Sequence, residues 1–324
     1  MLREHPPRVP PGPRGGHSVT LRLGTRASLL ATTQSGHVAD ALRAATGQDV
    51  ELVPITTDGD VLTGPLAQLG GTGVFVAALR DALLRGECDL VVHSMKDLPT
   101  APVPGLRIGA VPARQSARDV LCARDGLSFD DLPRGARVGT GSPRRVAQLR
   151  ARRPDLRVDG IRGNVDTRLR KVTDGEFDAI VLAEAGLNRI ERAGVITDRF
   201  PWPASAGQGA LAVEIRDDDA GMAAAVAAVD DADARTTALL ERAVLHRLEA
   251  GCAAPVGIAA QTDADAVRLV AEVYALDGTR SVRAERAVSR ADAVEDAPAV
   301  AELVVAELLA GGAAALADLG GSAR

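Results

Sequence analysis

The sequence predicts an α/β protein of three domains: two lobes built from βαβ units and a small α+β domain at the C-terminus. Three observations support this fold class. Short apolar segments alternate with helical patterns from Val19 to Arg85, and again from Arg137 to Arg192, which is typical of βαβ units with parallel strands. Beyond Gly251 the pattern changes to three alternating segments and one helix, which indicates an antiparallel sheet.

Length and composition favour a soluble globular protein. The chain has 324 residues, enough for two or three domains, and 46% hydrophobic and 25% charged residues are ordinary values. It has no run of about 18 apolar residues, so we expect no membrane span and no membrane partner. The first sixteen residues are rich in Pro, Gly and Arg and lack the apolar stretch of a secretory signal. We therefore expect a disordered extension over residues 1–18 and a cytoplasmic protein.

The cysteines and histidines argue against a disulfide framework and against a metal site. Cys88, Cys122 and Cys252 are far apart in the sequence and odd in number, and no pair has the spacing of zinc ligands. The five histidines form no cluster either. We expect no bound metal.

The first lobe is assigned to residues 19–112 and 210–228. Strands are expected at Val19–Leu23, Asp49–Ile55 and Leu106–Val111. A helix capped by Ser28 or Thr25 follows the first of these strands and ends near Ala45. The Gly- and Pro-containing stretch Thr56–Gly73 reads as a long mobile loop, and Val74–Arg85 reads as a helix. The segment Ala210–Ile215 is a strand that could return to this sheet.

A buried strand, Asp89–His93, runs directly into a polar turn. The turn reads SMKDLP, from Ser94 to Pro99. Ligands of open α/β sheets bind beyond the carboxyl ends of the strands, so Lys96 and Asp97 are candidate site residues. Taken from spacing alone, a simple surface turn explains the same residues.

The second lobe, residues 117–205, contains an arginine-rich segment. Between Arg134 and Arg170 there are eleven arginines and three aspartates, a net charge of +8, whereas the whole chain carries −5. The segment opens with a Gly-rich turn, after which Ser142 is a suitable N-cap and Pro143 a suitable first helical residue. Arginines in the first helical turn oppose the helix dipole, which indicates that an anion belongs there.

The rest of the second lobe follows a regular alternation. Asp119–Ala123 is a strand, and the strands and helices expected after it are strand 137–140, helix 143–152, strand 156–159, helix 164–173, strand 178–182 and helix 184–192. A solvated helix face explains Arg150, Arg152 and Arg153 as well as a binding role does. Nucleic-acid binding is disfavoured, because the chain is acidic and only 2% aromatic.

The third domain is assigned to residues 232–312. The amphipathic helix Asp230–Glu249 precedes three strands, and a helix capped by Asp296 follows them. The strands are expected at 255–262, 266–276 and 281–288, and the final helix at 297–309. We expect the tail, residues 313–324, to be frayed.

Taken together, the motifs resemble the porphobilinogen deaminase (hydroxymethylbilane synthase) family. The matching stretches, in chain order, are DLVVHSMKDLP (89–99), VGTGSPRR (138–145), IRGNVDTRL (161–169), AGQGA (206–210) and LEAGCAAPVG (248–257). The resemblance runs from Val19 to the C-terminal helix. It implies two lobes like those of periplasmic binding proteins, with the active site between them, and a third domain that carries a cofactor.

The resemblance also implies a reaction and a cofactor. The family condenses four porphobilinogen molecules head to tail, releases ammonia at each step and yields hydroxymethylbilane, a step of haem and other tetrapyrrole biosynthesis. The growing chain is built on dipyrromethane, itself made of two porphobilinogen units and joined by a thioether to a cysteine that matches Cys252. Each pyrrole carries an acetate and a propionate, and arginines suit such carboxylates. The resemblance also implies that this chain is a monomer.

Roles follow by motif position. The residues that match binders of the cofactor carboxylates are Ser94, Lys96, Thr140, Ser142, Arg144 and Arg145. Those that match binders of the incoming ring or of the chain end are Arg26, Ser28, Arg162, Arg168 and Arg189. Asp97 matches the catalytic carboxylate, which can stabilise cationic stages and assist proton transfer. Phe75 matches an aromatic residue beside a lid loop.

Some features depart from the family pattern, and two other classes stay open. Gln68 and Thr72 stand in the lid loop where members often carry lysines, which predicts a weaker electrostatic grip. A solute-binding module without catalysis fits two lobes around an anion site, although the Cys252 motif and the missing export signal disfavour it. A nucleic-acid or effector-sensing regulator lacks a helix-turn-helix pattern.

Overall fold

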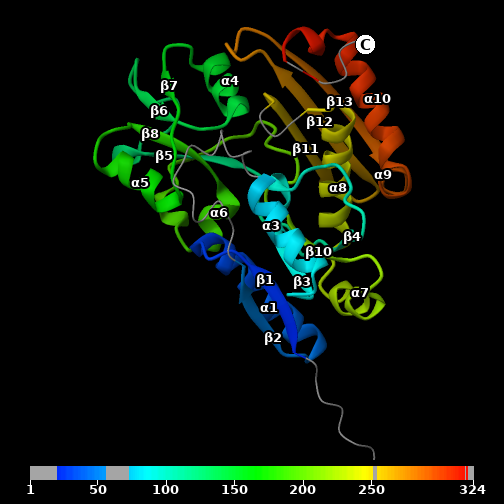
Figure 1. Cartoon of the computed structure of the whole chain (residues 1–324). Helices are drawn as coiled ribbons and strands as arrows, with labels where there is room; N and C mark the ends of the chain where they lie inside the picture. The colour runs from blue at the N-terminus through cyan, green and yellow to red at the C-terminus, as the bar shows by residue number, and fades with distance from the viewer. Residues whose placement is uncertain (1–19, 56–72, 251–253, 318, 320–324) are drawn as a thin grey trace, which may run out of the picture.

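A computed structural model of the chain describes residues 20–55, 73–250, 254–317 and 319, with backbone only for 73–75. Its described part contains three sheets in three separate regions (Figure 1). The sheet of β1 to β3 lies at the bottom of that view, the sheet of β5 to β8 at the upper left, and the sheet of β11 to β13 at the upper right. These sheets lie within the residue ranges predicted for the three domains, whose boundaries themselves stay predictions.

The first lobe is a five-stranded mixed sheet with the order β2-β1-β3-β10-β4. Its strands are β1 (Leu21–Thr25), β2 (Val50–Pro54), β3 (Leu90–Ser94), β4 (Leu106–Ala110) and β10 (Leu211–Arg216). Its helices are α1 (Leu29–Thr46), α3 (Gly73–Leu84) and α7 (Ala220–Ala227), and the 3-10 turn η1 covers Met95–Asp97. Strand β10 runs antiparallel between β3 and β4, so the predicted return to the first sheet is confirmed.

The second lobe is also a five-stranded sheet, with the order β7-β6-β8-β5-β9. Its strands are β5 (Asp119–Ala123), β6 (Arg137–Gly139), β7 (Arg157–Asp159), β8 (Ala179–Ala183) and β9 (Asp198–Arg199). Its helices are α4 (Pro143–Arg152), α5 (Val165–Thr173) and α6 (Glu184–Arg189), with 3-10 turns η2 (Arg124–Gly126) and η3 (Ala193–Val195). The predicted parallel run is confirmed for β6, β7 and β8. Strands β5 and β9 lie outside that run and pair antiparallel.

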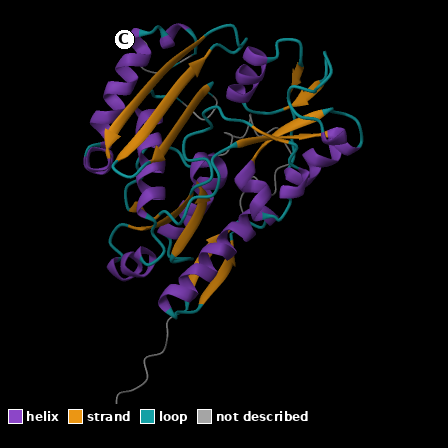
Figure 2. Cartoon of the chain, turned by 180° about the vertical axis from the view of Figure 1, so that it is seen from behind, coloured by secondary structure: helices purple, strands orange, loops and turns teal. Residues whose placement is uncertain are grey.

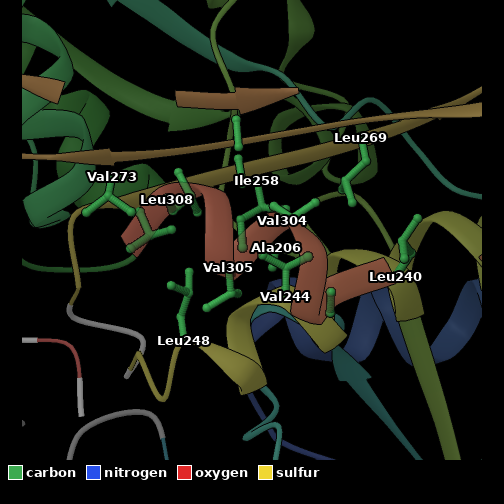
Figure 3. Close-up of a cluster of buried hydrophobic side chains, with 14 of the residues drawn as sticks. Ala206, Leu240, Val244, Leu248, Ile258, Leu269, Val273, Val304, Val305 and Leu308 are labelled. Atoms are coloured by element: carbon green, nitrogen blue, oxygen red, sulfur yellow. The ribbon is translucent and has the colours of Figure 1, made fainter. Parts of the chain in front are cut away.

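The third domain packs two helices on one face of an antiparallel sheet (Figure 2). Its strands are β11 (Val256–Thr262), β12 (Ala266–Tyr274) and β13 (Ser281–Ser289), and its helices are α8 (Ala232–Arg247), α9 (Arg290–Glu295) and α10 (Ala297–Ala310). Figure 3 shows leucine and valine side chains of α8 and α10 directed toward Ile258, Leu269 and Val273 of the sheet. Burial of these side chains, worth about 1.5–3 kcal/mol each, holds the domain together.

The C-terminal tail differs from the expectation of a frayed end. A 3-10 turn, η4 (Ala313–Ala315), follows α10, and Ala313 and Leu319 are buried in the core of the third domain. The expected mobile loop falls on residues 56–72 and the expected disordered extension on residues 1–18, both outside the described residues.

Two of the predicted helix caps make the capping hydrogen bond, and a third does not. Ser142 is the N-cap of α4, and its side chain accepts a hydrogen bond from Arg145 N. Asp296 caps α10 through Ala299 N, with a proline in the first turn. Ser28 occupies the N-cap position of α1, but its side chain makes no capping hydrogen bond.

Candidate functional site

The turn after β3 carries three of the predicted site residues. Strand β3 is buried, and the 3-10 turn η1 begins at once with Met95, whose side chain is fully buried. Anchoring by Met95 leaves Ser94, Lys96 and Asp97 half-buried around the strand end. The carboxyl end of a strand that stops at a tight turn therefore presents a hydroxyl, an ammonium and a carboxylate together.

Asp97 lines a cavity of about 80 Å³ in the first lobe, together with Arg26 and Ser94. The structure thus brings these three predicted residues together. Two further residues of the same cavity, Gln34 and His93, were missed by the sequence analysis. Gln34 Nε2 lies 3.0 Å from Ser94 Oγ, so helix α1 contributes to the site as well. The signal for Gln34 was slight, a polar residue in the second turn of the helix that follows the polar turn at residues 24–28.

His93 connects the cavity to a buried ion pair. Its Nε2 lies 3.2 Å from the carboxylate of Glu214 on β10, which Arg80 of α3 binds with three contacts of 2.7–3.1 Å. Burial alone would raise the pKa of Glu214, but the contacts with His93 and Arg80 lower it from 4.5 to about 2. Glu214 is therefore a fixed negative charge behind the cavity wall.

On the second lobe, the Gly-rich turn and α4 place the other predicted cofactor binders. Thr140 is buried, and its hydroxyl accepts a hydrogen bond from Ser142 N at 3.2 Å. Arg144 and Arg145 are also buried, on the first turn of α4. The two hydroxyls therefore shape the turn, and the two guanidinium groups extend from it into the molecule.

Asp119 is the anion that these two arginines meet. It is fully buried at the start of β5, 2.7 Å from Arg144 Nη1 and 2.6 Å from Arg145 Nη2. Burial would raise the pKa of Asp119, but the two guanidinium charges hold it well below its usual range. The anion indicated by arginines in a first helical turn is thus partly a carboxylate of the protein itself, which the sequence analysis did not single out.

Gln208 links the two lobes across this ion pair. Its Nε2 donates to Asp119 Oδ1 at 2.9 Å, while its Oε1 lies 3.4 Å from Lys96 Nζ. Burial lowers the pKa of Lys96, with the neighbouring Asp97 acting in the opposite direction. The predicted cations of the first and second lobes therefore form one continuous cluster around a buried carboxylate and an amide.

Two more predicted arginines, Arg168 and Arg189, add positive charge to the second-lobe side. Arg168 is half-buried and donates to Gly163 O at 2.7 Å, and its pKa is lowered by burial and by the charges of Arg145 and Arg162. Arg189 is buried, donates to Gly209 O at 2.6 Å, and has a pKa lowered by burial to about 10. Because the neighbouring cations disfavour the charged form of Arg168, an anionic ligand would relieve their repulsion.

An orphaned nitrogen supports the same conclusion. Arg144 Nε is buried and finds no hydrogen-bond partner among the described residues. A buried, unsatisfied charged donor is costly, and a ligand carboxylate is one group that would satisfy it. The residues present therefore fit an anionic group bearing several carboxylates.

Some predicted residues are not placed at the site. Cys252 lies outside the described residues, and so does the side chain of Phe75. Ser28 is exposed at the start of α1, and Arg162 is exposed in the turn before α5. The other two cysteines are buried, and burial raises the pKa of Cys88 to about 11 and of Cys122 to about 12, so neither is an activated thiol.

The described residues also limit the other classes of site. No group of three or more His, Cys, Asp or Glu side chains among them is arranged to hold a metal ion. Within the same residues no helix has the length and apolar character needed to cross a bilayer.

Fold and site together define a two-lobed α/β protein with an attached α+β domain, in which a cation cluster that fits an anionic ligand lies at the junction of the lobes beside Asp97. Comparison with known proteins gives the family. Residues 21–224 match the model of the porphobilinogen deaminase dipyrromethane cofactor binding domain, and residues 235–310 match the porphobilinogen deaminase C-terminal domain. The chain belongs to the porphobilinogen deaminase (hydroxymethylbilane synthase) family of transferases, and its cofactor is dipyrromethane.

Similar proteins cover nearly the whole chain. The porphobilinogen deaminase of Leifsonia xyli subsp. xyli is 55% identical over 97% of this chain and 99% of its own length. That of Thermobifida fusca is 55% identical over 90% and 94%, and porphobilinogen deaminase 1 of Streptomyces coelicolor is 52% identical over 91% and 97%. A periplasmic binding protein of Salmonella typhimurium, 16% identical, covers 65% of this chain and 91% of its own with a TM-score of 0.37, too distant to carry an argument.

Proposed function

We propose that this chain condenses four porphobilinogen molecules head to tail, with release of ammonia at each step, on a dipyrromethane group that Cys252 holds through a thioether. The observation that carries the proposal is the cation cluster around Asp119, which borders Asp97 and contains more positive charge than its own carboxylate neutralises. A product that gains two carboxylates per added ring needs such a surplus.

The cations are proposed to divide the carboxylates between them. Arg144 and Arg145 are buried, and Lys96 is half-buried next to them across Gln208, so these three suit the permanently bound dipyrromethane. Arg162 and Arg168 lie closer to the surface on the second lobe and suit the incoming ring. Arg26 shares the small cavity with Asp97, which supports a role for it in binding the reacting ring. Guanidinium groups bind carboxylates in a bidentate manner, which fixes ring orientation as well as charge.

Asp97 is proposed as the catalytic residue. Bound dipyrromethane would supply the terminal pyrrole to which the first new ring is added. Porphobilinogen becomes cationic when it loses ammonia, and a carboxylate that accepts its pyrrole N–H stabilises that positive charge. The same carboxylate can take up the proton that leaves when the new bond has formed. The half-buried position of Asp97 at the cavity wall suits both tasks.

Cys252 is proposed as the attachment point partly by elimination. Cys88 and Cys122 are buried with raised pKa values, which leaves Cys252 as the cysteine able to act as a thiolate nucleophile. Its described neighbours Ala250 and Ala254 pack against the core of the third domain. A cofactor attached there would be carried by a stable scaffold.

The intact mass of the purified full-length chain tests the proposal, with Cys252→Ala as the variant and Cys122→Ala as the matched control. We expect the mass of two linked pyrrole units on the wild type and on Cys122→Ala, and no added mass on Cys252→Ala. Protein without the adduct is then incubated with porphobilinogen and weighed again. If the wild type still gains no mass, the chain is a binding module and the proposal is wrong.

We further propose that the enzyme works as a cytoplasmic monomer with neither nucleic-acid nor membrane partners. The net charge of −5 supports this, because binding along a phosphate backbone favours a basic protein and this chain is acidic overall. Light scattering on a sizing column checks the monomer, and a dimer mass would contradict it.

A further inference from the structure

Helix α4, which carries Arg144 and Arg145, is held from the third domain. Gly278 forms the turn between β12 and β13 with a φ of +77°. A Cβ at that position would lie 2.6 Å from Ala151 N and 2.9 Å from Ala147 O, so the turn rests directly on the backbone of α4 (Figure 1). Arg150 Nη1 adds a hydrogen bond of 3.1 Å to Leu276 O.

A buried polar chain crosses the same interface. Gln148 on α4 is fully buried, and its Oε1 accepts a hydrogen bond of 2.7 Å from Arg144 Nη1. Its Nε2 donates to Pro203 O at 2.8 Å and to Tyr274 Oη at 3.1 Å. Tyr274, the last residue of β12, is 1% exposed. A side chain of the third domain is thus one residue removed from a predicted cofactor-binding arginine.

The protonation state of Tyr274 allows its oxygen to accept a hydrogen bond from Gln148. Burial raises the pKa of Tyr274 to about 12, and the Glu272 carboxylate contributes to the increase, so the phenol is neutral. A neutral phenol can accept from Gln148 while its own O–H points to another acceptor. Glu272 has two partners of its own, Ser281 Oγ at 2.8 Å and Arg283 Nη1 at 3.5 Å, so loss of the serine contact leaves the carboxylate paired.

The orientation of the Gln148 amide decides whether its oxygen or its nitrogen faces the Arg144 guanidinium. With both N–H groups of Gln148 engaged by Pro203 O and Tyr274 Oη, the carbonyl oxygen must face the guanidinium. If the tyrosine oxygen is removed, one N–H group of Gln148 is buried without an acceptor. The amide group then keeps only one of the two hydrogen bonds that its nitrogen donates. Arg144 would then lose a fixed acceptor close to its Nε, the buried nitrogen that a ligand carboxylate would satisfy.

We propose that Tyr274 is a positioning residue of the anion site: acting through Gln148, it sets the Arg144 guanidinium in the orientation that receives a carboxylate of the dipyrromethane. This inference rests on the proposed role of Arg144. It gives the third domain a second task besides carrying Cys252, because the same domain orients the group that binds what the cysteine holds.

The test compares Tyr274→Phe with Ser281→Ala, a matched control. Ser281 lies opposite Tyr274 in the sheet and makes one hydrogen bond to Glu272, without touching Gln148. Full-length chains made without cofactor are mixed with porphobilinogen, and intact mass follows the gain of two pyrrole units. We expect loading to slow about fivefold in Tyr274→Phe, the effect of one buried hydrogen bond, and to be unchanged in Ser281→Ala.

A double-mutant cycle with Arg144→Lys separates positioning from general destabilisation. Lysine cannot reproduce the contact with Gln148, so Tyr274→Phe should slow loading no further in that background. Equal loading by wild type and Tyr274→Phe would overturn the inference. So would the same fivefold loss in the Arg144→Lys background, because the tyrosine would then act through stability alone.

A second readout is independent of the reaction. The guanidinium N–H signals of Arg144, assigned by their loss in Arg144→Lys, should exchange with solvent about fivefold faster in Tyr274→Phe and at the wild-type rate in Ser281→Ala. If the wild type gains no mass from porphobilinogen, the proposed function fails, and these exchange rates still decide the inference. Unchanged exchange in Tyr274→Phe overturns it.

Discussion

At the scale of single residues, the site is a set of cations kept in place by two fixed negative charges. Asp119 holds Arg144 and Arg145, and Glu214 holds Arg80 beside His93. Both carboxylates are buried, and both have pKa values lowered by their partners against the effect of burial. Asp97 has a different position, half-buried at the wall of the small cavity that Arg26 and Ser94 also line.

Replacing Asp97 by asparagine should keep the fold and remove most of the turnover. An amide cannot stabilise the cationic ring or accept a proton, and such groups contribute about 10²–10⁴-fold. The measurement is the rate of hydroxymethylbilane formation, with circular dichroism as the check on folding. The control is Asp89→Asn. Asp89 immediately precedes β3, at the opposite end of the strand from Asp97, and its carboxylate binds Arg22. Wild-type turnover in Asp97→Asn would contradict the assignment.

The sequence was informative about residues whose role is local. Ser142 could be predicted as a cap because the signal lies within four residues of chain. Gln34, His93 and Asp119 could not be found in that way, since each reaches the site only through strand order and helix packing. Asp119 reads as an ordinary strand start until β8 and α4 bring two arginines onto it.

At the scale of elements, the sequence predicted those helices and strands whose signals lie within a short stretch of chain. Helix α4 occupies residues 143–152 as expected, because a Gly-rich turn, a cap and a proline mark its start. The antiparallel direction of β5 and β9 depends on how the chain crosses between lobes, which no local pattern encodes. Helix α7 was missed, since its Ala-rich sequence has little polar–apolar periodicity.

The contact between the β12–β13 turn and α4 makes a prediction about stability. Gly278→Ala forces an alanine into a backbone conformation with a φ of +77° and puts its Cβ against backbone atoms of α4. Gly47→Ala is the control, because it has a φ of +69° but open space around its Cβ. We expect about 1–2 kcal/mol of destabilisation for the control and a further cost of about 1–3 kcal/mol for Gly278→Ala. Equal shifts of the unfolding midpoint in the two variants would show that the turn does not bear on α4.

At the scale of the whole molecule, side chains and segments tie the domains together around the site. Arg114 binds Glu241 of α8 through two hydrogen bonds of 2.9 and 2.8 Å, and Arg242 of the same helix donates to Leu98 O and Pro99 O beside the η1 turn. Tyr274 of the third domain contacts Gln148 of the second lobe, so the third domain contacts both halves of the site. Its position depends on charge as much as on apolar packing.

Acid should weaken the first lobe through Glu214. Its pKa is about 2 in the folded chain against an ordinary 4.5, so its contribution to stability is complete above about pH 4.5 and is lost as pH falls toward 2. Glu214→Gln should remove this part of the pH dependence and be less stable at neutral pH, because Arg80 loses its counter-charge. Unfolding midpoints between pH 2 and 7 measure it, with the exposed pair Glu302–Arg247 as control through Glu302→Gln. An unchanged acid profile in Glu214→Gln would contradict the prediction.

The position of β10 also fixes an order of assembly during synthesis. In the described part of the chain β4 pairs with β10 and with no other strand, and β10 follows all five strands of the second lobe in sequence. A ribosome therefore releases the second lobe complete while the first lobe still lacks its penultimate strand. The unfinished edge of β3 stays open for about a hundred residues of translation, roughly 5–20 s at bacterial rates. The lobe that begins the chain is thus the last of the two to close.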